Sequence, residues 1–190
     1  MARLLSAAVC LGATLASTAP TRTAALVAAR MPAGPRQGTS EGNDLVPALK
    51  PFGFLQGDWD AVPGPSGETG SFSFKPGAQG HILVRTNFAS YPASAGKPAS
   101  RHDDLMVIAP DGDAVRADYF DSEGHVIRYT VRTVGSGEVV FTSEIKPNEP
   151  RYRLRYKSNS DASVAGQFEV APPAQPDSFK PYLTWTGRRR

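Results

Sequence analysis

The sequence predicts an all-β protein of about ten antiparallel strands that close into a barrel. Short runs rich in β-branched and aromatic residues follow one another from residue 57 almost to the end of the chain. Turn-forming residues separate these runs, and no connection leaves room for a crossover helix, so neighbouring strands should be antiparallel. The predicted strands span 57–62, 69–75, 80–88, 104–109, 114–120, 125–134, 138–145, 151–157, 163–170 and 182–187.

The segment before the first strand divides into three parts. Residues 1–25 resemble an export signal, because Arg3 precedes the apolar run LLSAAVCLGATLA and small residues follow it. This run is too short and too polar to span a bilayer comfortably. We expect export to the periplasm or exterior, with an organellar destination as the alternative. Residues 26–44 read as a flexible linker, and 45–190 as the barrel domain, which opens with a short helical lead-in.

Four turns carry the strongest local signals for hairpins. They are PDGD at 110–113, DSEG at 121–124, GSG at 135–137 and NSD at 159–161. Gly, Asn and Asp tolerate the positive φ angles that tight hairpins need. A series of such hairpins with one apolar face is expected to close so that no strand edge remains.

Alternation along the strands indicates which side chains share a face. In 81–88, His81, Leu83, Arg85 and Asn87 lie on one side, a mixture that is unusual for either a core or a solvated surface. Either this strand is covered on both sides or one face lines a cavity of mixed polarity. A ten-stranded barrel leaves interior room for a ligand.

A cationic stripe alternates with apolar residues in 151–157, RYRLRYK. Its functional interpretation is an anion-binding surface. The alternative, which we favour, is a solvated outer face whose charges pair with acidic residues of adjacent strands and protect against edge association.

Several motifs support a family resemblance. Residues 54–59, FLQGDW, look like the opening of calycin-type barrels, in which a helical lead-in enters strand one and a Trp, here Trp59, closes the bottom. The stretches HDDLMVI at 102–108, YFDSEGHVI at 119–127 and APP at 171–173 resemble a little-characterised bacterial family that is distantly similar to the nitrobindin group of haem-binding barrels. The resemblance implies a calycin-like, up-and-down barrel over about residues 45–187.

The chain departs from that group at the positions that concern haem. Asp60, Ala61 and Val62 follow Trp59 where nitrobindins continue with glycines, and no histidine follows His125, although their haem ligand lies near the C-terminus. We therefore expect no cofactor, with haem, held by His125 or a tyrosine, as the alternative.

A second group of polar residues is expected to meet in the barrel mouth. It would supply a cation, hydrogen-bond donors and titratable groups for the carboxylate or carbonyl of an otherwise apolar ligand. With Trp59, the candidate ligand-binding residues are Arg85, Asn87, His102, Tyr119, His125, Tyr129 and Tyr156, and Asp104 belongs to the same constellation. The tyrosines could instead be core residues whose hydroxyls reach backbone or water. Convergence of His81, His102 and His125 on a metal is a further alternative.

Composition excludes several function classes. The first 40 residues hold four arginines and no acid, and three arginines end the chain, so residues 41–187 carry 14 basic and 18 acidic side chains. This mildly acidic body argues against nucleic-acid binding. The single cysteine, Cys10, lies in the leader, which excludes disulfides and thiolate sites after cleavage. The predicted barrel, 45–190, contains no Gly-x-Ser-x-Gly elbow and no phosphate-binding loop.

We therefore expect non-catalytic binding of a small, mostly apolar molecule inside the barrel. An isomerase or lyase that uses a histidine at the mouth, and a solid-core structural or interaction barrel, are the alternatives.

Overall fold

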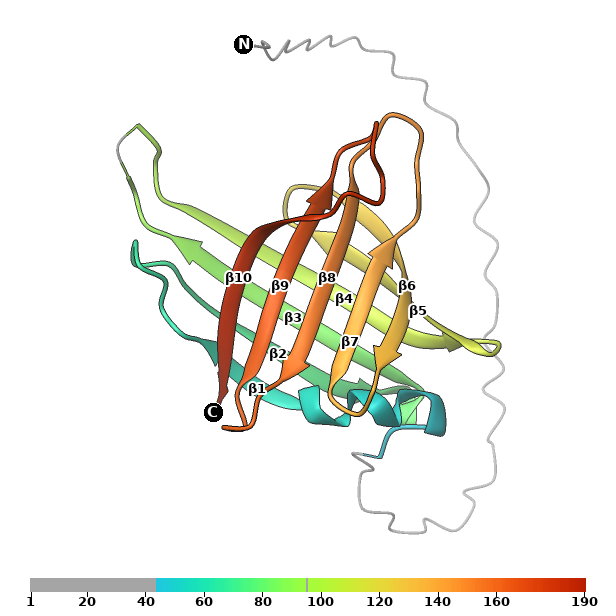
Figure 1. Ribbon diagram of the computed structural model, residues 1–190. Helices are drawn as coiled ribbons and strands as arrows, with labels where there is room; N and C mark the ends of the chain where they lie inside the picture. The colour runs from blue at the N-terminus through green and yellow to red at the C-terminus, as the bar shows by residue number, and fades with distance from the viewer. Residues whose placement is uncertain (1–43, 95) are drawn as a thin grey trace, which may run out of the picture. The chain divides into compact units, whose positions relative to one another are not determined.

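The computed structural model describes residues 44–94 and 96–190, which form a closed antiparallel barrel (Figure 1). Each strand pairs with the next along the chain, and β1 also pairs with β10, so the barrel has no free edge. The strands are β1 (Gly57–Ala61), β2 (Thr69–Gly77), β3 (Ile82–Tyr91), β4 (Ser100–Asp111), β5 (Ala114–Asp121), β6 (Val126–Val134), β7 (Glu138–Ser143), β8 (Arg151–Ser158), β9 (Val164–Ala171) and β10 (Lys180–Arg189).

The predicted all-β architecture and its ten antiparallel strands are thus confirmed. The predicted leader, 1–25, and residues 26–43 of the predicted linker lie outside the described residues.

The β3–β4 hairpin is longer than the sequence predicted. Its ladder continues past Phe88 through Ala89↔His102 to Tyr91↔Ser100, so residues expected in a loop belong to strands. The small and charged residues of 89–101 resemble loop composition. The turn itself lies between Tyr91 and Ser100, where Pro and Gly residues are concentrated.

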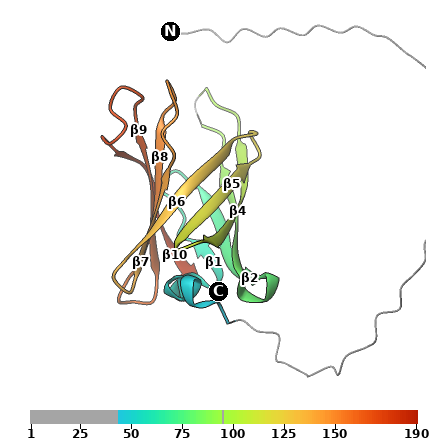
Figure 2. The ribbon, with the colours of Figure 1, turned by 90° about the vertical axis from the view of Figure 1, so that its right-hand side faces the viewer.

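A short helix and a plug of large side chains close one end of the barrel. The 3-10 helix η1 (Pro47–Leu55) buries Leu49, Phe52 and Leu55, and lies across the lower end of the strands (Figure 2). Trp59 follows on β1, where its indole Nε1 donates a hydrogen bond to the Leu55 carbonyl at 2.8 Å. The Arg189 guanidinium of β10 stacks 4.4 Å from the Trp59 ring, so the first and last strands are joined by side chains as well as by backbone.

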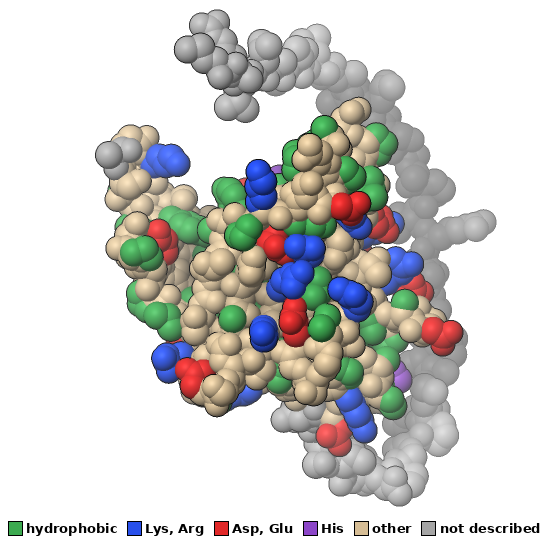
Figure 3. All heavy atoms as spheres, viewed as in Figure 1, with side chains coloured by type: hydrophobic (Ala, Val, Ile, Leu, Met, Phe, Trp, Pro, Cys, Tyr) green, Lys and Arg blue, Asp and Glu red, His purple; other side chains and the backbone are tan. Residues whose placement is uncertain are grey.

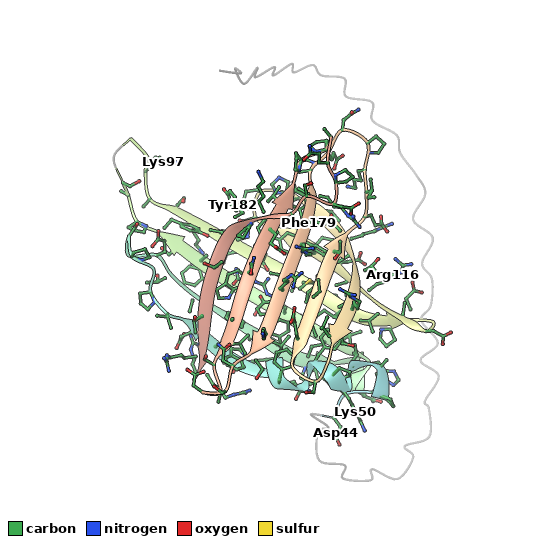
Figure 4. All side chains as sticks on the ribbon, viewed as in Figure 1. Asp44, Lys50, Lys97, Arg116, Phe179 and Tyr182 are labelled. Atoms are coloured by element: carbon green, nitrogen blue, oxygen red, sulfur yellow. The ribbon has the colours of Figure 1, made fainter. Side chains whose placement is uncertain are left out.

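The end of the barrel opposite η1 is its mouth. Because the strands run up and down, the β1–β2, β3–β4, β5–β6, β7–β8 and β9–β10 connections all lie at the mouth. Tyr182 and Phe179 mark it in Figure 4, at the far end of the molecule from Lys50 of η1. A second 3-10 turn, η2 (Ala78–Gly80), joins β2 to β3 at the η1 end.

The basic stripe of β8 lies on the outer wall and is paired there. Arg153 donates to Glu169 of β9, with Nη2 2.9 Å from Oε1, and Arg155 reaches Glu138 of β7 with Nη1 3.0 Å from Oε1. Figure 3 shows positive and negative side chains intermingled on this face of β7 to β10. These cross-strand pairs match the solvated-face interpretation of the stripe.

Candidate binding site at the mouth of the barrel

A cavity of about 630 Å³ occupies the mouth half of the barrel. Aromatic side chains make up much of its wall, among them Phe72, Tyr119, Tyr129, Tyr152, Phe168 and Trp185. Trp185 can lie flat along the wall because its cross-strand partner is Gly166, where a Cβ atom would stand 2.1 Å from the indole ring. The size and the aromatic lining are typical of sites for small, largely apolar molecules.

A buried ion pair lies at the base of this cavity. Arg85 of β3 and Asp104 of β4 have side chains only 5% and 3% exposed, and the Arg85 Nη1 is paired with the Asp104 Oδ1. The second carboxylate oxygen accepts a hydrogen bond from Asn87 Nδ2 at 2.9 Å. On its other side, Arg85 Nε donates to the Tyr156 hydroxyl of β8 at 2.7 Å, so the guanidinium links opposite walls of the barrel.

The pKa values of this group show that the charges are held in place. Burial alone would lower the pKa of Arg85, but Tyr156 and Asp104 more than compensate and raise it. Burial alone would raise the pKa of Asp104, but Arg85, His102 and Asn87 together lower it. Burial raises the pKa of Tyr156 to about 12 although Arg85 acts in the opposite direction. The ion pair therefore stays charged and Tyr156 stays protonated at neutral pH.

His102 extends this network toward the mouth. Its Nε2 lies 3.1 Å from the Tyr119 hydroxyl and 3.3 Å from Asp104 Oδ2, and its Nδ1 lies 2.8 Å from Glu123 Oε2. The hydrogen bond with Asp104 is the largest cause of a raised pKa for His102, and the negative charge of Glu123 adds to it, while burial opposes it. A protonated imidazole can donate to a carboxylate from both nitrogens.

The β5–β6 turn positions a second histidine. Asp121 Oδ1 accepts the backbone N–H groups of Glu123 at 3.1 Å and His125 at 2.8 Å, which is the hydrogen bonding of an Asx turn. Asp121 Oδ2 lies 2.9 Å from His125 Nδ1 and 3.3 Å from the Tyr119 hydroxyl. Burial would raise the pKa of Asp121, but the bonds from His125 outweigh it and lower that pKa.

The structure brings six of the eight predicted ligand-binding residues to the cavity wall: Arg85, Asn87, His102, Tyr119, His125 and Tyr129. Trp59 does not line it, because the register of β1 with β10 places that ring in the plug at the η1 end. Tyr156 lies beneath the cavity, where it packs among Phe72, Phe74 and Trp185 and orients Arg85.

Arg85 was also expected to hold the carboxylate or carbonyl group of a ligand. In the structure Asp104 and Tyr156 already occupy that guanidinium. Asp121 and Glu123 were not among the predicted site residues, since both look like ordinary turn residues. An Asp at the first position of a turn that precedes a histidine is the signal that could have identified them.

The histidines do not converge on one metal. Leu83 pairs with Ile108 and Ala89 pairs with His102, so His81, just before β3, lies at the opposite end of this ladder from His102. A different set, His102, Asp121 and Glu123, offers donor atoms within 4.8 Å of one another. A divalent ion there would have to displace the proton that His102 shares with its carboxylate partners.

Haem, which the family resemblance raises, needs an axial donor. His125 could supply one, because Asp121 holds its Nδ1 and leaves Nε2 to coordinate. The carboxylates of Asp121 and Glu123 on the same turn would repel haem propionates. The residues at the mouth therefore fit the iron better than they fit the rest of that cofactor.

The buried ion pair gives a direct test of this geometry. We expect Asp104→Asn to lower the free energy of unfolding by about 3 kcal/mol, because Arg85 would remain buried without a counter-charge. The neighbouring substitution Asp103→Asn is the matched control, since Asp103 pairs with Arg101 on the exposed surface. Urea unfolding of both variants checks this, and equal midpoints for the two variants would contradict it.

The raised pKa of His102 predicts a pH dependence. Because the pKa lies above its ordinary value of 6.5, the contribution of His102 to stability is complete below that value and is lost as the pH rises through the folded-state pKa. The difference in free energy of unfolding between the native chain and His102→Gln should be largest below about pH 6.5 and should shrink as the pH rises above it. In NMR titrations Asp104→Asn should lower the pKa of His102, and a native His102 that titrates at or below its ordinary value would refute the assignment.

No relative of known function helps to interpret this site. The chain matches no known protein-family model and no curated protein at a significant level. None of the helices in residues 44–94 and 96–190 is long and apolar enough to cross a membrane.

Proposed function

We propose that this protein binds a small, mostly apolar molecule in the barrel cavity without chemically changing it. One observation carries the proposal: a cavity of about 630 Å³ joins an aromatic wall to a buried network of hydrogen-bonding groups. A solid-core barrel would have filled this space with side chains, as dense packing is the usual state of a protein interior.

The two sides of the cavity differ in chemistry. The wall from β8, β9 and β10 carries Tyr152, Leu154, Phe168 and Trp185, whereas β3, β4, β5 and the following turn carry the charged and hydrogen-bonding groups around His102. An elongated ligand with one polar end satisfies both sides when that end lies near His102 and Tyr119. Burial of its apolar part then supplies most of the affinity.

We also propose that the barrel is calycin-like. Up-and-down closure, the short helix η1 before β1, and the Trp59 plug beside Leu55 support this classification. The same features agree with the motif at 54–59, from which the resemblance was drawn.

The test uses N-phenyl-1-naphthylamine, an uncharged probe whose fluorescence rises in apolar surroundings. We expect saturable binding to the native protein and a loss of at least about tenfold in affinity for Ile127→Trp, because the indole would fill the cavity. Thr130→Trp, on the exposed outer face of the same strand β6, is the matched control and should bind like the native protein. Absence of probe binding by the native chain, or equal binding by both variants, would refute the proposal.

An enzyme of isomerase or lyase type is a second candidate, favoured by the contacts of His102. A histidine next to a carboxylate and a tyrosine hydroxyl is the arrangement that general acid–base catalysis needs. Burial is the largest cause of the raised pKa of Tyr119, so its hydroxyl stays protonated and could donate a proton to a substrate oxygen.

Mass spectrometry separates the two candidates. Incubation with a small-molecule extract of the host should leave every compound unchanged if the protein only binds. Conversion of more than one molar equivalent of a compound, lost in His102→Gln while the naphthylamine probe still binds, would establish the enzyme instead.

A further inference from the structure

In the described part of the cavity wall, every arginine and histidine side chain already faces a carboxylate. Arg85 is paired with Asp104, and the Arg101 Nη2 lies 2.6 Å from an Asp103 oxygen. The two histidines are paired in the same way: His102 with Asp104 and Glu123, and His125 with Asp121.

Carboxylates outnumber guanidinium groups on this wall. Glu68, Asp104, Asp121 and Glu123 line the cavity, so four carboxylates face three cationic groups there when His102 is protonated along with Arg85 and Arg101. Glu68, in the β1–β2 connection, receives a hydrogen bond from the backbone N–H of Ser66 at 3.0 Å and makes no ion pair with another described residue. Glu68 is therefore the lining carboxylate that no cation of the described residues balances, and the charge left over for a ligand is negative.

This charge distribution discriminates between polar ends of a ligand. An entering carboxylate would lose its hydration and meet Asp121 and Glu123 without an unpaired cation to compensate, and burial of an uncompensated charge is costly. An ammonium group would meet the uncompensated carboxylate of Glu68, the half-exposed carboxylate of Glu123 and the tyrosine rings of the wall, all of which attract a cation.

We propose that the cavity selects a lipophilic amine over a carboxylate of the same size. This inference rests on the proposed binding function and names the chemical class of its ligand. The ammonium end would lie toward Glu68 and Glu123 at the mouth, and the hydrocarbon chain along Phe168 and Trp185. It also follows that anionic amphiphiles, fatty acids among them, are poor ligands.

Three probes of equal chain length test this inference. Decylamine, decanol and decanoate would each displace N-phenyl-1-naphthylamine from the full-length protein at neutral pH, below their micelle concentrations. We expect half-displacement by decylamine at a concentration at least about tenfold lower than by decanoate, with decanol between them.

Two variants assign the selectivity to the cavity. Glu123→Gln removes a carboxylate that lines the cavity, and should reduce the preference for decylamine over decanoate severalfold. Glu144→Gln makes the same change of net charge at an exposed position that does not line the cavity, and should leave the preference unchanged. Equal shifts in both variants would show that net charge rather than the site decides, and would overturn the assignment.

The failures of the two proposals are distinguishable. If the naphthylamine probe binds but decanoate displaces it as well as decylamine does, or neither displaces it, the ligand class is wrong and the binding function stands. If the naphthylamine probe does not bind the native protein, the binding function itself fails.

Discussion

The interior of this barrel depends on one buried cation, Arg85. A guanidinium cannot give up its proton inside a protein, so the fold must surround it with acceptors. Asp104 and Tyr156 meet that requirement from β4 and β8. The remaining oxygen of Asp104 is then satisfied by Asn87 and His102, since a buried acceptor left unpaired would be destabilising. The network at the mouth is thus built outward from a single charge.

Much of the fold could be predicted because its turns are encoded locally. Gly112, Gly124 and Gly135 adopt positive φ in the β4–β5, β5–β6 and β6–β7 turns, as hairpins of this kind require. The mixed face of β3 was also informative, because Leu83, Arg85 and Asn87 do point inward, with Leu83 in the core and Asn87 on the cavity wall. A strand whose inward face changes from apolar to polar along its length indicates a barrel that is filled at one end and hollow at the other.

The pairing of the site residues could not be predicted, because it depends on contacts between distant parts of the chain. Arg85 and Tyr156 are 71 residues apart, and only closure of the barrel brings β8 opposite β3. The prediction that Arg85 binds the polar end of a ligand did not anticipate that Asp104 and Tyr156 already occupy its guanidinium. Trp59 differs, because the resemblance at 54–59 placed it at the bottom of the barrel, where its ring does lie; only its second assignment, as a ligand contact, disagrees with the cavity lining.

Arg85 is already paired and so offers no free guanidinium to the propionates of haem, the cofactor of the group that the sequence resembles. A haem-binding barrel must tolerate two propionates at its entrance, yet here the β5–β6 turn presents Asp121 and Glu123, and the histidines beside them are held by those carboxylates. On the cavity wall formed by the described residues, Arg85, Arg101 and the two histidines each already face a carboxylate of the protein. A cavity with aromatic walls can keep its shape while its ligand class changes, because the shape is set by the strands and the charge by a few side chains at the mouth. The proposed ligand class therefore rests on the charge balance at the mouth and not on the barrel itself.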